Sequence, residues 1–120
     1  MGIEPIEGQV LMLAAAKASV GPRLPALVDR VQAILGERLG QYRREYECVH
    51  ETADRACFLV EWGHWETLGD ELGLDRRERS AVRRAHEEQL LRIGRRTDRE
   101  TEFETALEIR EPVVVGLRKG

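Results

Sequence analysis

The sequence has few of the residues from which small proteins build covalent frameworks or membrane anchors. Two Cys in 120 residues cannot form a disulfide framework. The longest apolar run, residues 10–16, is too short to span a bilayer. Glu4 and Glu7 precede that run, where a signal peptide would carry positive charge. Asn is absent, and only two of the 19 basic residues are Lys. We therefore expect a cytoplasmic protein with no membrane partner.

The composition is that of a folded domain rather than of a disordered tail. Hydrophobic residues make up 42% of the chain, which is enough for a core. A chain of this length buries roughly two-thirds of its unfolded surface on folding, so we expect a single domain over residues 1–120. Charged residues reach 34%, yet the net charge is only −3. That balance argues against a globally basic nucleic-acid binder but leaves room for a local basic face.

Two helices are expected at the start of the chain. Residues 7–20 are apolar on nearly every side, which is typical of a buried helix, and Gly21 and Pro22 end it. The next helix has Pro25 in its first turn and apolar residues at helical spacing up to about Gly40. Both helices are therefore expected to contribute to the core.

A β-hairpin is expected over residues 44–51 and 55–62. Its second strand is apolar at the even positions from 56 to 62. This face meets Cys48 and His50 on the first strand only if the loop has an odd number of residues, because a one-residue slip turns every side chain over. The loop 52–54 meets that condition and places Glu51 opposite Arg55. In this register Cys57 faces away from the other two candidate metal ligands.

The second half of the chain predicts two helices and a strand. A short helix over 64–72 precedes a long one that Asp75 caps, with Glu78 completing a capping box, and that extends to about Arg96. Residues 101–110 alternate in polarity, and the alternation continues past Pro112, which predicts an edge strand over 101–117. The expected fold is α+β, in the order α-α-β-β-α-α-β, with a small antiparallel sheet packed on helices.

Few Cys and His residues are available as zinc ligands. Cys48, His50, Cys57 and His64 are of the types that zinc prefers. Their spacing is C-x-H-x6-C-x6-H and lacks the C-x2-C pair of a zinc knuckle, and the expected hairpin register separates Cys57 from Cys48 and His50. A zinc-binding protein or metal-dependent enzyme that uses Cys48, His50 and Cys57 is therefore our third hypothesis about function, after the two given below. We assign no metal ligand and no cofactor.

No catalytic residue is assigned either. Ser19 and Ser80 both lie outside a G-x-S-x-G turn, and no G-x-G-x-x-G or Walker sequence is present to hold a phosphate. His50 and His86 are each followed by Glu, as in a metalloprotease helix. The second His of that pattern is missing, since positions 54 and 90 are Asp and Leu. The sequence thus favours a protein that is not an enzyme.

The strongest local signal is the arginine content of the helix over 75–96. Arg77, Arg84 and Arg95 fall within about twenty degrees of one another on a helical wheel, so they would form a stripe able to contact phosphates. The same helix has acidic residues four positions from arginines, which is typical of a solvated helix crossed by ion pairs. Binding of nucleic acid or the ribosome through this stripe is the second hypothesis.

Two segments resemble a known group of proteins. The sequence Ala85-His-Glu-Glu-Gln-Leu-Leu-Arg-Ile-Gly-Arg-Arg-Thr-Asp-Arg-Glu and the later Ala106-Leu-Glu-Ile-Arg-Glu-Pro-Val-Val-Val-Gly are similar to small haloarchaeal proteins of unknown function. The resemblance in style extends over nearly the whole chain. It implies an intracellular protein and no activity.

The first hypothesis is a small non-enzymatic interaction or regulatory protein that self-associates. The strand expected over 101–117 continues into the apolar residues 113–115. The free edge of such a strand exposes unpaired backbone groups and has to be covered. Pairing with a second copy would cover it, which predicts a homo-oligomer.

Overall fold

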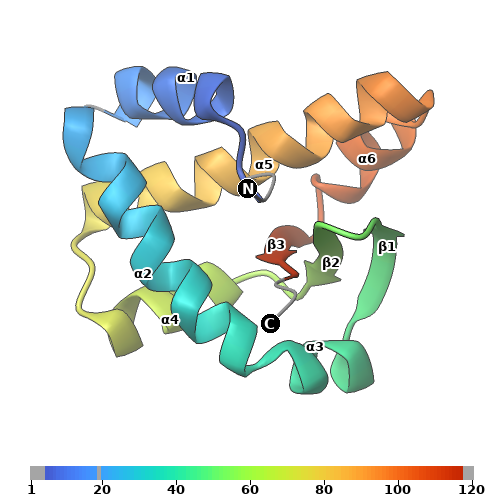
Figure 1. Ribbon diagram of the computed structural model, residues 1–120, viewed down its shortest axis with the longest axis horizontal. Coiled ribbons are helices and arrows are strands. Elements are labelled where there is room, and N and C mark those ends of the chain that lie inside the picture. Colours follow the sequence, from blue (N-terminus) through green and yellow to red (C-terminus); the bar gives the residue numbers. More distant parts are fainter. Residues whose placement is uncertain (1–4, 19, 118–120) are drawn as a thin grey trace.

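The computed structural model describes residues 5–18 and 20–117, in which helices surround a three-stranded sheet (Figure 1). The expected α+β class and the order α-α-β-β-α-α-β are confirmed, and α3 and α6 are two further short helices. The elements in chain order are α1 (Gly8–Ala18), the 3-10 turn η1 (Gly21–Arg23), α2 (Leu24–Glu37), α3 (Leu39–Glu45), β1 (Glu47–Glu51), β2 (Arg55–Val60), α4 (His64–Leu72), α5 (Arg76–Thr97), α6 (Glu100–Ala106) and β3 (Glu111–Gly116).

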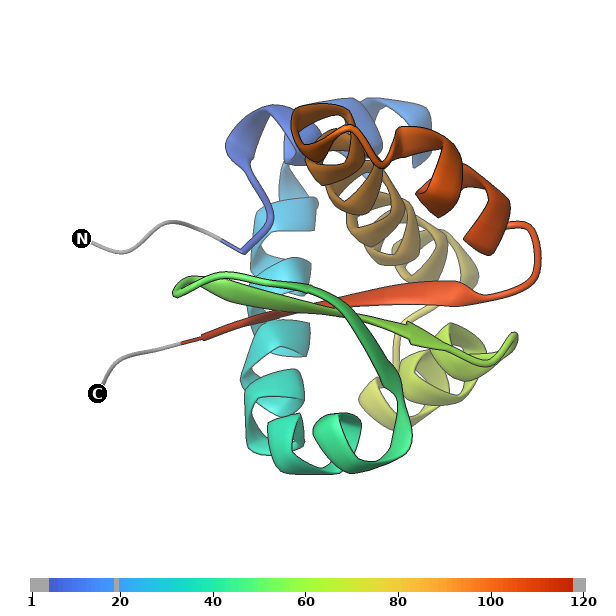
Figure 2. The same cartoon turned by 90° about the vertical axis from the view of Figure 1, so that its right-hand side faces the viewer.

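The sheet is antiparallel throughout and has the strand order β1-β2-β3. Figure 2 shows it edge-on, with α1, α5 and α6 on one side and α3 and α4 on the other. All six residues of the central strand β2 are buried. Because helices cover both faces, β2 is apolar at nearly every position, as strands buried on both sides are.

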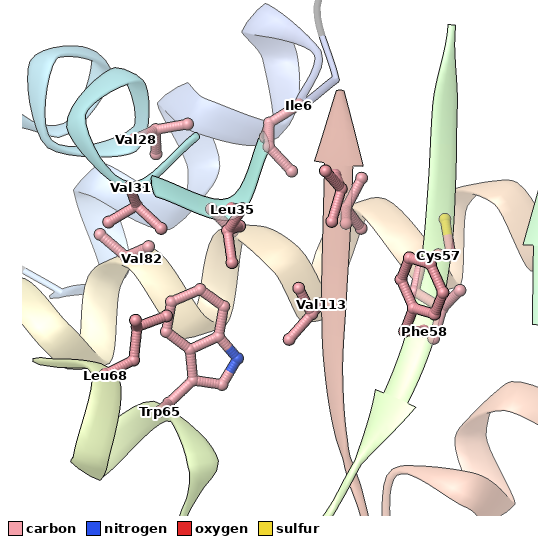
Figure 3. Close-up of a cluster of buried hydrophobic side chains, with 14 of the residues drawn as sticks. Ile6, Val28, Val31, Leu35, Cys57, Phe58, Trp65, Leu68, Val82 and Val113 are labelled. Atoms are coloured by element: carbon pink, nitrogen blue, oxygen red, sulfur yellow. The ribbon is translucent and has the colours of Figure 1, made fainter. Parts of the chain in front are cut away.

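The core is formed where α2, α4 and α5 meet the sheet. Figure 3 shows Trp65 of α4 between Val82 of α5 and Val113 of β3, with Leu35 of α2 close by. The Trp65 side chain is only 1% exposed. Burial of a side chain of this size is among the largest single contributions to the stability of a small domain.

The long helix α5 begins as its sequence predicts. The Asp75 carboxylate accepts from the backbone N–H of Glu78 at 2.8 Å, and the Glu78 carboxylate accepts from the backbone N–H of Asp75 at 2.9 Å. This capping box satisfies two backbone donors at the helix start. It fixes the corner between α4 and α5, where Gly73 adopts φ 69°.

The expected hairpin register is wrong by one residue at the turn. Glu51 lies opposite Ala56 rather than Arg55, and a β-bulge between Cys48 and His50 then restores the expected register, in which Cys48 lies opposite Phe58. The Thr52 hydroxyl accepts from the backbone N–H groups of Asp54 and Arg55 at 3.2 and 3.3 Å, which tightens the turn. Glu51 is held instead by Arg43 of α3, at 2.7 Å. Sequence parity alone cannot reveal a bulge, which adds one unpaired residue.

The strand expected over residues 101–110 is also wrong, because α6 occupies most of this segment. Phe103 is fully buried, whereas the two Thr residues that completed the alternation, Thr101 and Thr105, are exposed. Arg99, at the start of the same helix, lies 4.5 Å from the centre of the Phe103 ring. The buried Phe103 packs against Gly94 of α5 and so anchors the helix. Only residues 111–116 form the strand β3.

Three further expectations about the ends and faces of elements need correction. α1 is not buried on all sides, because Met12 and Leu13 are 73% and 53% exposed while Val10 and Ala14 pack inward. The second helix ends at Glu37, and α3 occupies the start of the expected hairpin. Trp62 follows the end of β2 and lies outside the sheet. The exposed face of α1, the end of α2 and the position of Trp62 each depend on tertiary packing rather than on the local sequence.

Candidate functional site

The free edge of β3, which the sequence offers as a surface for pairing with a second copy, is closed within the chain. The Pro112 carbonyl accepts from the Trp65 indole N–H at 2.8 Å. The Val114 N–H donates to Nδ1 of His86 at 2.9 Å, and its carbonyl accepts from the Gln32 amide at 2.7 Å. Gln32 also accepts from the Gly116 N–H at 2.8 Å. Three side chains thus replace a fourth strand, and the predicted strand pairing has no free partner on this edge.

His86 contributes to this edge as a neutral, structural residue. Its side chain is fully buried, and its ring centre lies 4.6 Å from that of Trp65. Because Nδ1 accepts from a backbone N–H, the proton of the neutral ring is on Nε2. Burial lowers the pKa of His86 to about 3. The imidazole therefore holds the strand in place and is not placed to exchange protons with a substrate.

The outer edge of β1 is protected by different means. The carbonyl of Val49, at the bulge, accepts from Arg99 at 2.6 Å. Glu47 and Glu51 flank it and pair with Arg110, just before β3, and with Arg43 of α3, at 2.8 and 2.7 Å. A bulge combined with charged side chains is a common way of preventing strand addition.

The candidate zinc ligands do not converge. Cys48 lies opposite Phe58, as expected, but the bulge places His50 opposite Cys57. Cys57 therefore shares a face of the sheet with His50, contrary to the expected register, and Cys48 lies on the other face. Cys48 is exposed and Cys57 is buried, and burial raises the pKa of the Cys57 thiol to about 12. Among the residues that the structure describes, no group of three or more His, Cys, Asp or Glu side chains is arranged to hold a metal ion.

His64 belongs to a separate aromatic cluster between α3 and α4. Its Nε2 lies 2.6 Å from the Tyr42 hydroxyl, and its Nδ1 lies 3.8 Å from Glu61. The arrangement resembles a relay for activating a nucleophile, but Tyr42 is buried, and that burial raises the pKa of its hydroxyl well above the usual value. A hydroxyl so firmly protonated and so inaccessible is a structural hydrogen-bond donor.

The three arginines of the expected phosphate stripe have different surroundings. Arg77 is exposed, Arg84 is half-buried, and Arg95 pairs with Glu100 at 3.1 Å. Glu88 lies between Arg84 and Arg95 on the same face of α5, and it pairs with Lys17 of α1 at 3.4 Å. An acidic residue and a neighbouring helix therefore interrupt the stripe, whose binding of nucleic acid stays a prediction.

A groove of about 290 Å³ lies between α4 and the first half of α5, and we call it the Trp62 groove. It contains the exposed Trp62, which is 61% accessible. Arg76, Arg79 and Arg83 project from α5 at helical spacing along one wall. The groove is lined by Trp62, Gly63, Trp65, Glu66, Arg76, Arg79, Ser80, Arg83 and Glu111.

The charges in the Trp62 groove are only partly satisfied within the chain. Arg79 pairs with Asp70 at 3.2 Å, and Arg83 lies 3.9 Å from Glu111. Glu111 is only 4% exposed and accepts from the backbone N–H of Trp65 at 2.9 Å. Arg76 and Glu66 are exposed and have no ion-pair partner among residues 5–18 and 20–117. One charge of each sign thus remains available on the two walls.

Sequence reasoning missed this groove because it assigned Trp62 to the apolar face of a strand. One signal was present: Arg76, Arg79 and Arg83 recur at spacings of three and four residues. Gly69 of α4 allows the two helices to approach, since a Cβ there would lie 2.5 Å from the Arg79 side chain. Which helix faces these arginines is a matter of tertiary packing and is not visible in the spacing.

Comparison with known proteins identifies a family without an activity. No match was found among curated proteins or among solved structures. Within the described ranges, no helix combines the length and hydropathy that crossing a bilayer requires. A family model described as Domain of unknown function (DUF8048) matches residues 4–117, so the chain belongs to that family.

Proposed function

We propose that this chain is a small non-enzymatic interaction protein that self-associates through the Trp62 groove. The observation that carries the proposal is a tryptophan that is 61% exposed beside two charges with no ion-pair partner in the described part of the chain, whose other tryptophan is 1% exposed. Trp and Arg are the residues that most often dominate the binding energy of protein interfaces. With both sheet edges protected, a side-chain surface is the better supported route to the homo-oligomer that we expect.

The charge of the groove supports a protein partner over a polyanion. Its three arginines are opposed by Glu66 and Glu111 in the groove and by Asp70 beside it. A nucleic-acid backbone would therefore meet nearly equal numbers of positive and negative groups, without the net positive field on which phosphate binding depends. At about 290 Å³ the groove is also at the lower end of small-molecule sites and is lined mainly by polar side chains.

Light scattering at high micromolar protein concentration tests the proposal. We expect the wild type to have a mass near twice 13.7 kDa and Trp62→Ala to remain near 13.7 kDa. Met12→Ala removes an apolar side chain that is 73% exposed on α1, outside the groove, and should not change the mass. A wild-type mass near 13.7 kDa would contradict self-association.

The second hypothesis, nucleic-acid or ribosome binding through Arg77, Arg84 and Arg95, has its own signature. It requires an affinity that falls steeply with salt and is lost in the Arg84→Glu, Arg95→Glu double variant. The Trp62→Ala variant would leave such binding unchanged. We further propose a cytoplasmic location and, from the resemblance of residues 85–100 and 106–116, a haloarchaeal source.

A further inference from the structure

The two unpaired charges of the Trp62 groove lie on opposite walls and at opposite ends. α4 runs antiparallel to α5, since Trp65 lies beside His86 whereas Asp70, further along α4, pairs with Arg79. Glu66 is therefore near the end of the groove where α4 begins, and Arg76 is at the end where α5 begins. Trp62 lies at the same end as Glu66, just before α4.

A two-fold axis that lies in the interface and crosses the line from Glu66 to Arg76 at its midpoint, at a right angle, exchanges these two positions. In an isologous dimer each residue meets the partner's copy of the residue whose position the axis exchanges with its own. Glu66 of one copy then faces Arg76 of the partner subunit, and the reciprocal contact forms at the other end. The Trp62 indole reaches the same arginine, where its ring face can accept the guanidinium.

We infer that the occupant of the Trp62 groove is a second copy of this chain, docked about a two-fold axis with two reciprocal Glu66–Arg76 pairs. This inference rests on the proposed function and adds the partner geometry. The pairing is self-complementary, because each copy supplies one positive and one negative member. It also gives specificity, since a partner with the wrong charge at either position would bury like charges against each other.

Exchanging the two charges tests this geometry. Glu66→Arg alone and Arg76→Glu alone each create two like-charge contacts in a homodimer, so we expect the dimer dissociation constant to rise about tenfold or more. An equimolar mixture of the two variants restores two opposite-charge contacts per dimer and should recover the wild-type mass. Sedimentation equilibrium of each variant and of the mixture measures this directly. Both side chains are exposed, and circular dichroism will verify that each variant is folded.

A matched control and the alternative outcomes separate this inference from the function on which it rests. Glu104→Arg makes the same change at an exposed position of α6 and should leave dimerisation as in the wild type. If the wild type dimerises and depends on Trp62, but the mixture does not recover, the two-fold pairing is wrong and the self-association stands. A monomeric wild type overturns both.

Discussion

The edge of β3 and the Trp62 groove both present polar groups beside the same core, but they differ in how many of those groups have a partner. At the edge, Gln32, His86 and Trp65 satisfy the backbone groups that a neighbouring strand would otherwise take. In the groove, Arg76 and Glu66 are left without partners in the described part of the chain. The fold thus closes the surface on which small sheets aggregate and leaves open a surface with mixed charges.

The comparison also applies to the two tryptophans. Trp65 packs between helices and sheet and donates to the β3 edge, whereas Trp62, three positions earlier, faces solvent in the groove. One residue therefore contributes to folding and the other is available for association. Substitution of Trp65 should therefore lower the free energy of unfolding, whereas substitution of Trp62 should weaken self-association and leave folding almost unchanged.

The largest expected effect is the loss of stability in Trp65→Ala. Truncating a fully buried aromatic residue costs about 3–5 kcal/mol, which is a large part of the stability of a small domain. Trp62→Ala should change the free energy of unfolding by less than about 0.5 kcal/mol, because the side chain is exposed. Urea titration of dilute protein, followed by circular dichroism, measures both. Equal losses in the two variants would show that Trp62 is also part of the core.

The next effect is a dependence of stability on pH at the β3 edge. Since the folded-state pKa of His86 is about 3 rather than 6.5, the neutral ring contributes its full stability above about pH 6.5. This contribution is lost progressively as the pH falls from about 6.5 towards 3, by up to about 1.4 kcal/mol per pH unit. His86→Gln keeps a carbonyl acceptor for the Val114 N–H but does not titrate. Its unfolding free energy should therefore vary less than that of the wild type between about pH 6.5 and 5; identical slopes would contradict this account of the edge.

A smaller effect is expected at Gln32. Gln32→Leu leaves the Val114 carbonyl and the Gly116 N–H without their partner, which should cost about 1–3 kcal/mol. Gln9 is an exposed counterpart whose side chain accepts from Arg92, so Gln9→Leu should cost less than about 0.5 kcal/mol. Thermal unfolding compares the two variants. If both lower stability equally, the side-chain bonds at the β3 edge are not essential to it.

Much of the architecture was predictable from local signals. The capping box of Asp75 and Glu78 marks the start of α5 in the sequence, and Gly73 marks the end of α4. The α+β class follows from the order of these elements. Signals of this kind involve residues a few positions apart, so they survive whatever tertiary contacts form later.

The errors arose where neighbours distant in sequence decide the outcome. Residues 101–110 alternate in polarity, but only Phe103 had a buried site to fill, and the segment folds as a helix around it. The hairpin register depends on a bulge that brings the Val49 carbonyl to Arg99, fifty residues away. The Trp62 groove requires α4 and α5 to pack side by side. Apart from the spacing of the arginines in the groove, none of these contacts leaves a period in the sequence.

The most direct test of the central claim is the accessibility of Trp62 as a function of protein concentration. Trp65 is buried at any concentration, so collisional quenching of tryptophan fluorescence reports mainly on Trp62. If the groove joins two copies, quenching of the wild type should decrease as the protein is concentrated, and no such change should occur in Trp62→Phe. Quenching that is independent of concentration, up to the high micromolar range, would show that the groove stays open and that the account is wrong.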